Sequence, residues 1–390
     1  MSNTTIRSNF GLIGDKLELK KNISIELDDN GKITDLFYDN IKEDITFTKK
    51  KQIFLLIPGF INSHVHICDS FAKEQGFNKG LIETVAPPNG IKHVLLSKIS
   101  KEIKMHGIRE AAIEMLASGI TMFFDFRENG LTGIALLKEA LQNSPINYRI
   151  LGRFNDTTEI ESVLKCADGL GFASYDQLSS ENKEFIKNLK REYLDKIVAT
   201  HDGELSRDEL LFNQIINDQL IDVIIHGTHY RKDDLERLKK NNISLVLCPR
   251  SNGYFGSGFP PINEIYDLGI PISLGTDNVM ANNIDLFEEM RYLYRISRVL
   301  AVHKDCKNFS SKDLLEMVTI TAARNLGLEK EYGSISEGKY ADFFLVDLSN
   351  PNYYTYKINS ESIYNIIVQR TKSENIKKTY IKGVMEFERK

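Results

Sequence analysis

Short apolar runs that alternate with amphipathic stretches are the feature of this sequence that most constrains its fold. The runs, each the length of a strand, are Gly119–Phe126, Tyr148–Arg153, Asp168–Ala173, Lys196–His201, Asp222–His226, Ser244–Cys248 and Ile270–Gly275. Repeated strand–helix units imply a parallel sheet, and their number favours a closed (β/α)8 TIM-like barrel. The alternative is an open doubly wound sheet. It would normally show a glycine-rich phosphate turn after its first strand, and the sequence has none.

The two ends of the chain have a different pattern, which predicts β-structure. Leu17–Leu27 and Ile33–Tyr38 alternate apolar and polar residues, and the Asn-Gly pair at 30–31 is a hairpin-turn signal. Ala341–Asp347 and Thr379–Phe387 are also strand-like. Neither end has enough strands to form an independent sheet, so we expect the two ends to pair. The predicted α/β fold therefore has a composite β-sandwich domain of residues 1–56 plus 333–390 and a barrel domain of residues 57–332.

Composition narrows the class of protein. A chain of 390 residues with 42% hydrophobic and 27% charged residues is globular. The net charge of −4 leaves no basic excess to hold a nucleic-acid backbone. The apolar stretches are too short to span a membrane, the first residues do not resemble a signal peptide, and the four cysteines are too scattered for a disulfide framework. We therefore expect a cytoplasmic protein with no nucleic-acid or membrane partner, and we leave a homo-oligomer open.

A His-x-His motif ends the first strand of the predicted barrel. The apolar run Leu55–His66 carries His64 and His66 at its end. Because side chains on a strand alternate between its two faces, these two imidazoles point the same way and can bind one metal ion. Alone, such a motif is weak evidence for a metal site.

Three further strands end in side chains that can bind metal. Ile197–His201 and Val223–His226 end in histidine, and Pro271–Asp277 ends in aspartate. In an α/β barrel the carboxyl ends of all strands meet on the face where active sites lie. Three or four nitrogen and oxygen ligands with an open position are what a catalytic zinc ion requires. The alternative is a set of independent core histidines with a helix-capping aspartate, which would have to produce this arrangement repeatedly by chance.

Glu204 lies three residues after His201, just past the end of its strand. A carboxylate at this place can take a proton from an activated water and pass it on. The alternative role is to complement the dipole at the start of the next helix. Beside the predicted metal ligands, we favour proton transfer.

Several segments resemble the metal-dependent amidohydrolase superfamily, and more narrowly its cytosine deaminase, guanine deaminase and chlorohydrolase group. In order and spacing they cover nearly the whole chain: Pro58–His66, His201–Glu204, His226–His229, Cys248–Asn252, Leu274–Asp277, Asn282–Met290 and Gly338–Phe343. The metal ligands that the resemblance implies are His64, His66, His201 and Asp277. The catalytic residues that it implies are Glu204, His226 and Asp277. The implied metal is zinc, with iron as the alternative.

Two departures from the family pattern carry further expectations. Superfamily members with two metals commonly have a carboxylated lysine at the end of the fourth strand. Gly169–Ser174 has no lysine at its end, so we expect one metal ion per chain. Many deaminases of this group have a histidine where this chain has Leu247, so we expect no close kinship with guanine deaminase or S-adenosylhomocysteine deaminase.

Polar residues near other strand ends are the candidate substrate contacts: Arg127, Arg153, Arg250 and Asn252. Because guanidinium groups suit carboxylates and phosphates, we expect a substrate with an anionic group. The alternative is that the arginines pair with Asp125, Glu128 or Asp156. We expect the long segment Asp69–His93 to cover the barrel mouth and to supply part of the pocket.

The sequence thus predicts a metal-dependent hydrolase that acts on non-peptide carbon–nitrogen bonds. The favoured reaction is hydrolytic deamination of a nucleobase-like or other nitrogen heterocycle by a metal-activated water. The alternative reaction is ring-amide hydrolysis of the imidazolonepropionase type, which the resemblance indicates would use the same catalytic residues. A third hypothesis is a non-catalytic relative that retains the barrel for binding, and the filled ligand positions argue against it.

Overall fold

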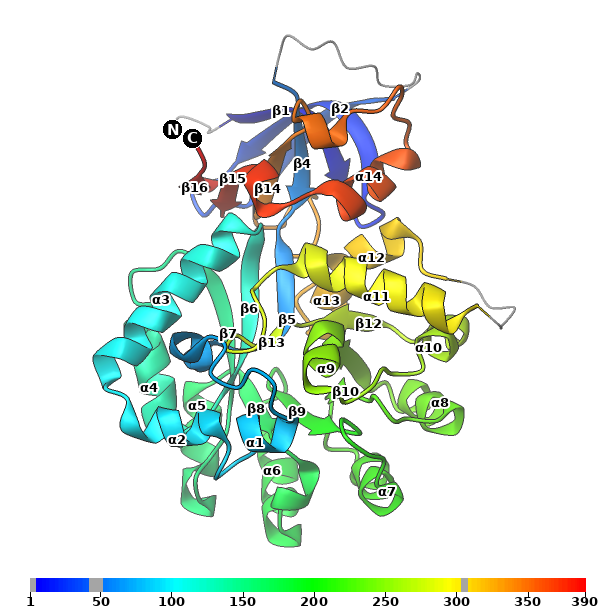
Figure 1. Cartoon of the computed structure of the whole chain (residues 1–390). Coiled ribbons are helices and arrows are strands. Elements are labelled where there is room, and N and C mark those ends of the chain that lie inside the picture. Colours follow the sequence, from blue (N-terminus) through cyan, green and yellow to red (C-terminus); the bar gives the residue numbers. More distant parts are fainter. Residues whose placement is uncertain (1–4, 42–51, 303–307) are drawn as a thin grey trace.

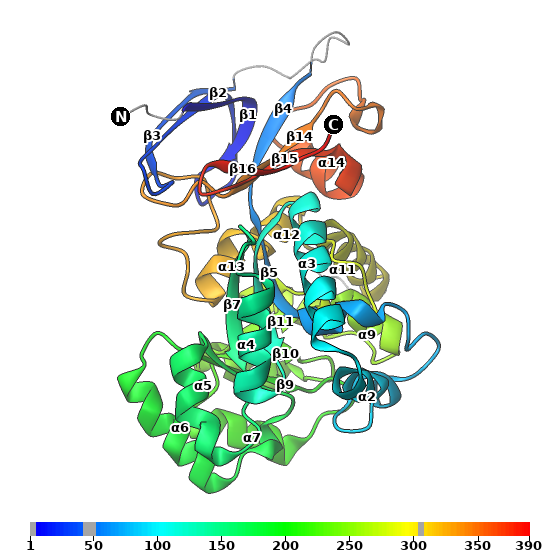
Figure 2. The same cartoon turned by 90° about the vertical axis from the view of Figure 1, so that its left-hand side faces the viewer.

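The structure of this chain is a computed structural model that describes residues 5–41, 52–302 and 308–390 (Figure 1). It consists of a barrel of parallel strands surrounded by helices and of a smaller sheet at one end of the barrel. Figure 2 shows the same two parts from the side, with the smaller sheet built from both ends of the chain. The site described below lies in the barrel.

The barrel closes through an interrupted eighth strand. Its strands are β5 (Phe60–His66), β6 (Ile120–Arg127), β7 (Asn147–Gly152), β8 (Gly169–Phe172), β9 (Ile197–Asp202), β10 (Val223–His226), β11 (Ser244–Leu247), β12 (Ile272–Leu274) and β13 (Asp277–Asn278). All pair in parallel, and only Gly275 and Thr276 separate β12 from β13. β12 pairs with β11, whereas β13 pairs with β5 on the other side. The predicted TIM-like barrel is therefore confirmed.

Helices cover the outside of the barrel and bury their apolar faces against it. They are α3 (Lys101–Ala117), α4 (Gly130–Ala140), α5 (Ile160–Cys166), α6 (Ser180–Glu192), α7 (Glu209–Asp218), α8 (Lys232–Lys240), α9 (Pro249–Phe255), α10 (Ile262–Leu268), α11 (Leu286–Leu300), α12 (Ser311–Met317) and α13 (Ile320–Asn325). In α8, for example, Leu235 and Leu238 lie one turn apart and are both fully buried. This packing forms the largest apolar core of the molecule.

The two ends of the chain form one mixed sheet with a core of its own. Its strands are β1 (Thr5–Ile13), β2 (Glu18–Leu27), β3 (Ile33–Asn40), β4 (Phe54–Pro58), β14 (Phe343–Asp347), β15 (Ile376–Ile381) and β16 (Val384–Glu388), and α14 (Ser362–Arg370) lies beside them. The order is β16-β15-β14-β4-β1-β2-β3, so strands from both ends of the sequence meet at β14 and β4. The predicted pairing of the two ends is confirmed. The strand β1 was outside the predicted set. The domain boundaries at residues 57 and 332 stay a prediction.

A cover segment connects β5 to α3 across the barrel mouth, as the sequence predicts. It contains a 3-10 helix, η1 (Ile67–Ala72), and the short helices α1 (Leu81–Val85) and α2 (Ile91–Lys98) (Figure 1). Four apolar residues of this segment line the cavity at the mouth: Leu81, Val85, Ala86 and Pro87. Other 3-10 turns are η2 (Thr157–Glu159), η3 (Tyr175–Gln177), η4 (Pro351–Tyr353) and η5 (Ser373–Asn375). Among the described residues, no helix is long and apolar enough to cross a membrane.

Candidate active site

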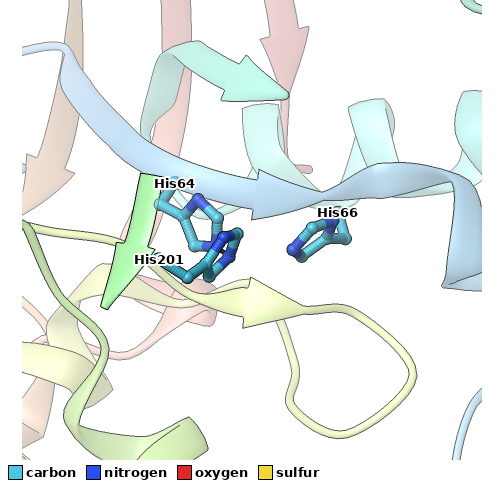
Figure 3. Close-up of side chains that lie close together, drawn as sticks. All are labelled: His64, His66 and His201. Atoms are coloured by element: carbon cyan, nitrogen blue, oxygen red, sulfur yellow. Dashed lines mark hydrogen bonds between the residues drawn. The ribbon is translucent and has the colours of Figure 1, made fainter. Parts of the chain in front are cut away.

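Four side chains that can bind metal converge at the carboxyl ends of the barrel strands. Figure 3 shows His64 and His66 on β5 and His201 on β9, with the three imidazoles in one space. Nε2 of His64 lies 3.3 Å from Nε2 of His201 and 3.2 Å from Oδ1 of Asp277. Nε2 of His66 lies 3.6 Å from the same oxygen of Asp277. The structure therefore brings together the four ligands that the sequence predicts.

Hydrogen bonds on the outer side of the rings determine which nitrogens face inward. Nδ1 of His66 lies 2.9 Å from Oε1 of Glu128, and Nδ1 of His201 donates to the carbonyl oxygen of Phe172 at 2.7 Å. Each Nδ1 thus carries the proton, and each Nε2 presents its lone pair to the centre. Burial lowers the pKa of His66 to about 3 and lowers that of His201 well below its ordinary value. Neutral imidazoles whose lone pairs converge beside a carboxylate fit a zinc ion, since without a cation they would repel one another.

The interrupted strand places the carboxylate of Asp277 against β5. Gly275 separates β12 from β13, and a Cβ at this position would lie 2.6 Å from Cβ of His64. Only glycine therefore allows this approach. Asp277 then has a φ of 58°, a left-handed backbone that is uncommon for a residue other than glycine. Its carboxylate accepts hydrogen bonds from Ser251 Oγ at 2.5 Å and from Asn278 Nδ2 at 2.8 Å, which fix its orientation.

Glu204 and His226 form the second half of the site. Oε1 of Glu204 lies 3.5 Å from Nε2 of His226, and both side chains line the same cavity as His66, His201 and Asp277. Burial raises the pKa of Glu204 to about 7. A carboxyl group with this pKa can both accept and donate a proton near neutral pH. His226 also has a left-handed backbone, with a φ of 77°, which turns its ring toward Glu204.

The cavity at the barrel mouth is small and partly roofed by the cover segment. Its volume is about 130 Å³, well below the range of roughly 300–1,000 Å³ of pockets for drug-sized ligands. The end of β8 contributes Ala173 to its wall. The side chain at the place where two-metal relatives would carry a lysine is therefore a methyl group.

Two of the candidate substrate arginines are held by protein carboxylates instead. Arg127 is fully buried, and its guanidinium pairs with Asp125 at 3.1 Å and with Glu128. Arg250 pairs with Glu288 at 3.1 Å and with Glu289 at 3.5 Å. Neither arginine lines the cavity. The expectation that Arg127 and Arg250 contact substrate is corrected, because both charges are neutralised within the fold.

Arg153 differs from the other two arginines. Its side chain lines the cavity, and its buried Nε has no hydrogen-bond partner among the described residues. Burial lowers the pKa of Arg153, and the nearby Glu128 carboxylate opposes this shift. A buried guanidinium nitrogen without a hydrogen-bond partner can bind a polar group of a ligand.

Asn252 has a different role from the predicted substrate contact. Its Oδ1 lies 2.9 Å from Nδ1 of His226, and its Nδ2 donates to Thr228 Oγ1 at 2.7 Å. The side chain is 1% exposed and does not line the cavity. The expectation is corrected: Asn252 orients the ring of His226 and has no free face for a substrate.

Four polar residues of the cavity wall were not individually predicted as site residues. Lys92 and His93 come from the cover segment, Glu128 follows β6, and Asn278 follows Asp277. His93 donates from Nε2 to the carbonyl oxygen of Val85 at 3.1 Å. The only feature of the sequence that could have indicated a role for Asn278 in the site is that it directly follows Asp277. Lys92 has no sequence signal, since a lysine on a short helix usually faces solvent.

The comparisons with known proteins agree with this geometry. The profile of the amidohydrolase family matches residues 55–385. An uncharacterised protein of Methanocaldococcus jannaschii is 36% identical over 321 residues, which are 78% of this chain and 81% of the relative. The chain therefore belongs to the amidohydrolase family.

Two further similarities concern proteins with named activities. A 5-methylthioadenosine/S-adenosylhomocysteine deaminase of Thermoanaerobacter pseudethanolicus is 29% identical over 81% of this chain and 78% of its own length. A crystal structure of a Xanthomonas campestris adenosine deaminase with bound zinc has a TM-score of 0.79 at 19% identity, covering 98% of this chain and 92% of the other. The second similarity shows the shared fold. The similarity to the Thermoanaerobacter pseudethanolicus deaminase corrects the expectation drawn from Leu247, because the chain is related to an S-adenosylhomocysteine deaminase despite this leucine.

Proposed function

We propose that this chain is a metal-dependent aminohydrolase that removes an amino group from a nucleobase-like nitrogen heterocycle. Membership of the amidohydrolase family makes it a hydrolase, and several of its relatives are deaminases. The observation that carries the proposal is the pair Glu204 and His226, which lines one cavity together with His66, His201 and Asp277. All positions that the chemistry requires are filled.

The chain's own residues account for the movement of protons. Zinc, when bound, would act as a Lewis acid and lower the pKa of water. Oε1 of Glu204 would take a proton from the attacking water and deliver it to the departing amino group, since its pKa is about 7. Nε2 of His226, held by Asn252 through the other ring nitrogen, faces Glu204 and the substrate ring.

A single zinc ion per chain is part of the proposal. The imidazole nitrogens of His64, His66 and His201 and the carboxylate oxygen of Asp277 give the donor set typical of zinc, and iron is the alternative. Ala173 at the end of β8 offers no bridging group for a second metal. The zinc in the Xanthomonas campestris structure supports this choice.

Cavity size and charge narrow the substrate. A volume of about 130 Å³ suits a heterocyclic base better than a base with an attached sugar. The unpartnered guanidinium of Arg153 favours a ring that carries a carbonyl or anionic group. We therefore favour a free oxo-substituted or acidic heterocycle. A cytoplasmic location and the oligomeric state stay predictions.

A screen for ammonia release tests the proposal. Zinc-loaded protein would be incubated with purines, pyrimidines, pterins and their nucleosides, and ammonia would be measured against a Glu204→Gln control. Release from at least one free heterocycle, absent in the control, is the expected result. Ring opening with acid production and no ammonia would instead support the imidazolonepropionase type of reaction. No turnover of any compound by zinc-loaded protein would contradict both.

A further inference from the structure

Lys92 is a buried ammonium group on a helix that otherwise belongs to the cover of the cavity. It lies in the first turn of α2, and only 3% of its side chain is exposed. Its Nζ lies 2.5 Å from Oε1 of Glu128 and 3.1 Å from Oδ1 of Asn278. Oδ2 of Asp69 is the third nearby oxygen, at 3.7 Å. Glu128 and Asn278 lie at the ends of barrel strands, whereas Asp69 lies in η1 of the cover, so the ammonium ties α2 to the barrel.

Two of these partners in turn hold metal ligands. The oxygen of Glu128 that contacts Lys92 also lies 2.9 Å from Nδ1 of His66. The amide of Asn278 that accepts from Lys92 also donates to Oδ1 of Asp277 at 2.8 Å. β5 and β13 pair side by side, with Asn278 opposite His66. One ammonium therefore reaches two of the four ligands, each through a single intervening side chain.

The charge balance around Lys92 shows what its loss would change. Asp69, Asp125 and Glu128 are buried carboxylates, and among the described residues Lys92 and Arg127 are the cations within ion-pair distance of them. Arg127 contacts Asp125 and Glu128 but not Asp69. Without Lys92, His66 would be the only remaining partner of the shared Glu128 oxygen among the described residues. A buried carboxylate that loses a nearby cation rearranges, and a displaced Glu128 would no longer hold the ring of His66 in the same orientation.

We propose that Lys92 is a positioning residue that couples closure of the cover to the geometry of the metal centre. When α2 is seated, the ammonium fixes Glu128 and Asn278, and these hold His66 and Asp277 in place. When α2 lifts, both supports lose their common partner. The inference rests on the metal site of the proposed function, but it does not depend on which substrate is turned over.

Metal affinity and ligand geometry test this coupling without any activity measurement. Zinc affinity would be measured by competition with a chromogenic chelator for wild type, Lys92→Met, Lys92→Arg and Lys98→Met. Lys98 is exposed on the same helix and provides the matched control. We expect Lys92→Met to weaken zinc binding by about 10- to 100-fold, as loss of an outer support of a ligand does. Lys92→Arg should restore part of the affinity, and Lys98→Met should change nothing.

A spectroscopic reading separates positioning from a general loss of stability. In the cobalt-substituted proteins the visible absorption bands report the ligand geometry, so they should shift in Lys92→Met and stay unchanged in Lys98→Met. A folded Lys92→Met protein with wild-type zinc affinity and wild-type cobalt bands would overturn the inference.

The wild-type protein offers a test that needs no variant. If the cover and the metal centre are coupled, zinc must favour the seated state of α2 as strongly as that state favours zinc. Amide hydrogen exchange in 91–98 should therefore slow when zinc alone is added. Equal exchange with and without bound zinc would contradict the coupling. Zinc-dependent protection in a protein that releases no ammonia would support it while contradicting the proposed function, and a protein that binds no zinc would contradict both.

Discussion

The ring of His226 is held between two side chains, with Nδ1 2.9 Å from Oδ1 of Asn252 and Nε2 3.5 Å from Oε1 of Glu204. Because the amide group of Asn252 donates to Thr228, its oxygen must be the atom that faces the ring. Nδ1 therefore carries a proton, and Nε2 is the nitrogen presented to the cavity. The tautomer of His226 is thus determined by a residue that does not touch the cavity.

Replacing Asn252 with alanine should lower turnover without removing the metal. The His226 ring would lose its only hydrogen-bonded anchor among the described residues, so kcat should fall by about 10- to 100-fold while the zinc content stays at the wild-type level. Steady-state kinetics and elemental analysis measure the two effects. Thr228→Val, which removes only the contact behind Asn252, should have a smaller effect. Loss of zinc from Asn252→Ala would show that this residue supports the ligands instead.

Replacing Glu204 with glutamine should separate catalysis from metal binding. The amide keeps the size of the side chain but cannot accept a proton, so turnover should fall by roughly 10²–10⁴-fold with zinc retained. Glu209→Gln is the matched control, since Glu209 lies nearby in the sequence, at the first position of α7, and is exposed. If zinc is lost from Glu204→Gln, the carboxylate is a ligand or a structural group and the proton-transfer role is wrong.

Protein purified without chelator should contain about one zinc per chain, because the two groups of converging metal-capable side chains among the described residues share His64 and so lie at one place. The double substitution His64→Ala/His66→Ala removes two of the four ligands and should abolish binding. His229→Ala, at an exposed position beyond β10, should leave the zinc content unchanged. A consistent value of two metal ions per chain would contradict the interpretation of Ala173 at the end of β8.

Arg153 and Arg250 should respond differently to the same substitution. Arg153→Met removes the unpartnered guanidinium of the cavity, so KM for an acidic or oxo-substituted ring should rise by about 10- to 100-fold. Arg250→Met removes the cation that faces buried Glu289, so it should lower the free energy of unfolding and leave KM unchanged. Equal effects of both substitutions on KM would rule out a specific role for Arg153.

The pH dependence of stability should change when Asp342 is replaced by asparagine. This carboxyl is buried beneath the terminal sheet, and burial raises its pKa to about 7 from an ordinary value of 3.8. The folded protein thus holds a proton that the unfolded chain releases, so stability falls as the pH rises from about 4 to about 7. Asp342→Asn lacks this titration and should gain stability relative to wild type between pH 5 and pH 8. Urea midpoints at the two pH values, both in chelator, measure this. If the urea midpoints of wild type and Asp342→Asn differed by the same amount at pH 5 and at pH 8, the raised pKa of Asp342 would be contradicted.

The convergence of His64, His66, His201 and Asp277 could be predicted from the sequence because each ends an apolar strand, and a barrel brings strand ends together whatever the details of packing. The pairing of Arg127 with Asp125 and Glu128 was an alternative in the sequence analysis, because these residues are neighbours in the chain. The partners of Arg250 could not be predicted in the same way. Arg250 pairs with Glu288 and Glu289 on α11. These residues lie far from Arg250 in the sequence, so no local pattern around Arg250 predicts the contact. Lys92 was missed for the same reason, since its burial depends on how the cover packs on the barrel. Local patterns thus predicted the ligands, and tertiary contacts decided the charges around them.

A single residue, Gly59, separates the last strand of the first terminal segment from the strand that carries His64 and His66. A side chain here would collide with Thr121, because a Cβ would lie 2.1 Å from its Oγ1. β4, on one side of Gly59, is clamped between β1 and β14, so the metal-bearing strand is a direct continuation of the terminal sheet. The terminal sheet and the barrel thus share one nearly continuous strand, formed by β4 and β5. Split versions or circular permutants of this protein must therefore keep 54–66 as one uncut piece, and a barrel excised at Gly59 would lose the tether of the strand on which its chemistry depends.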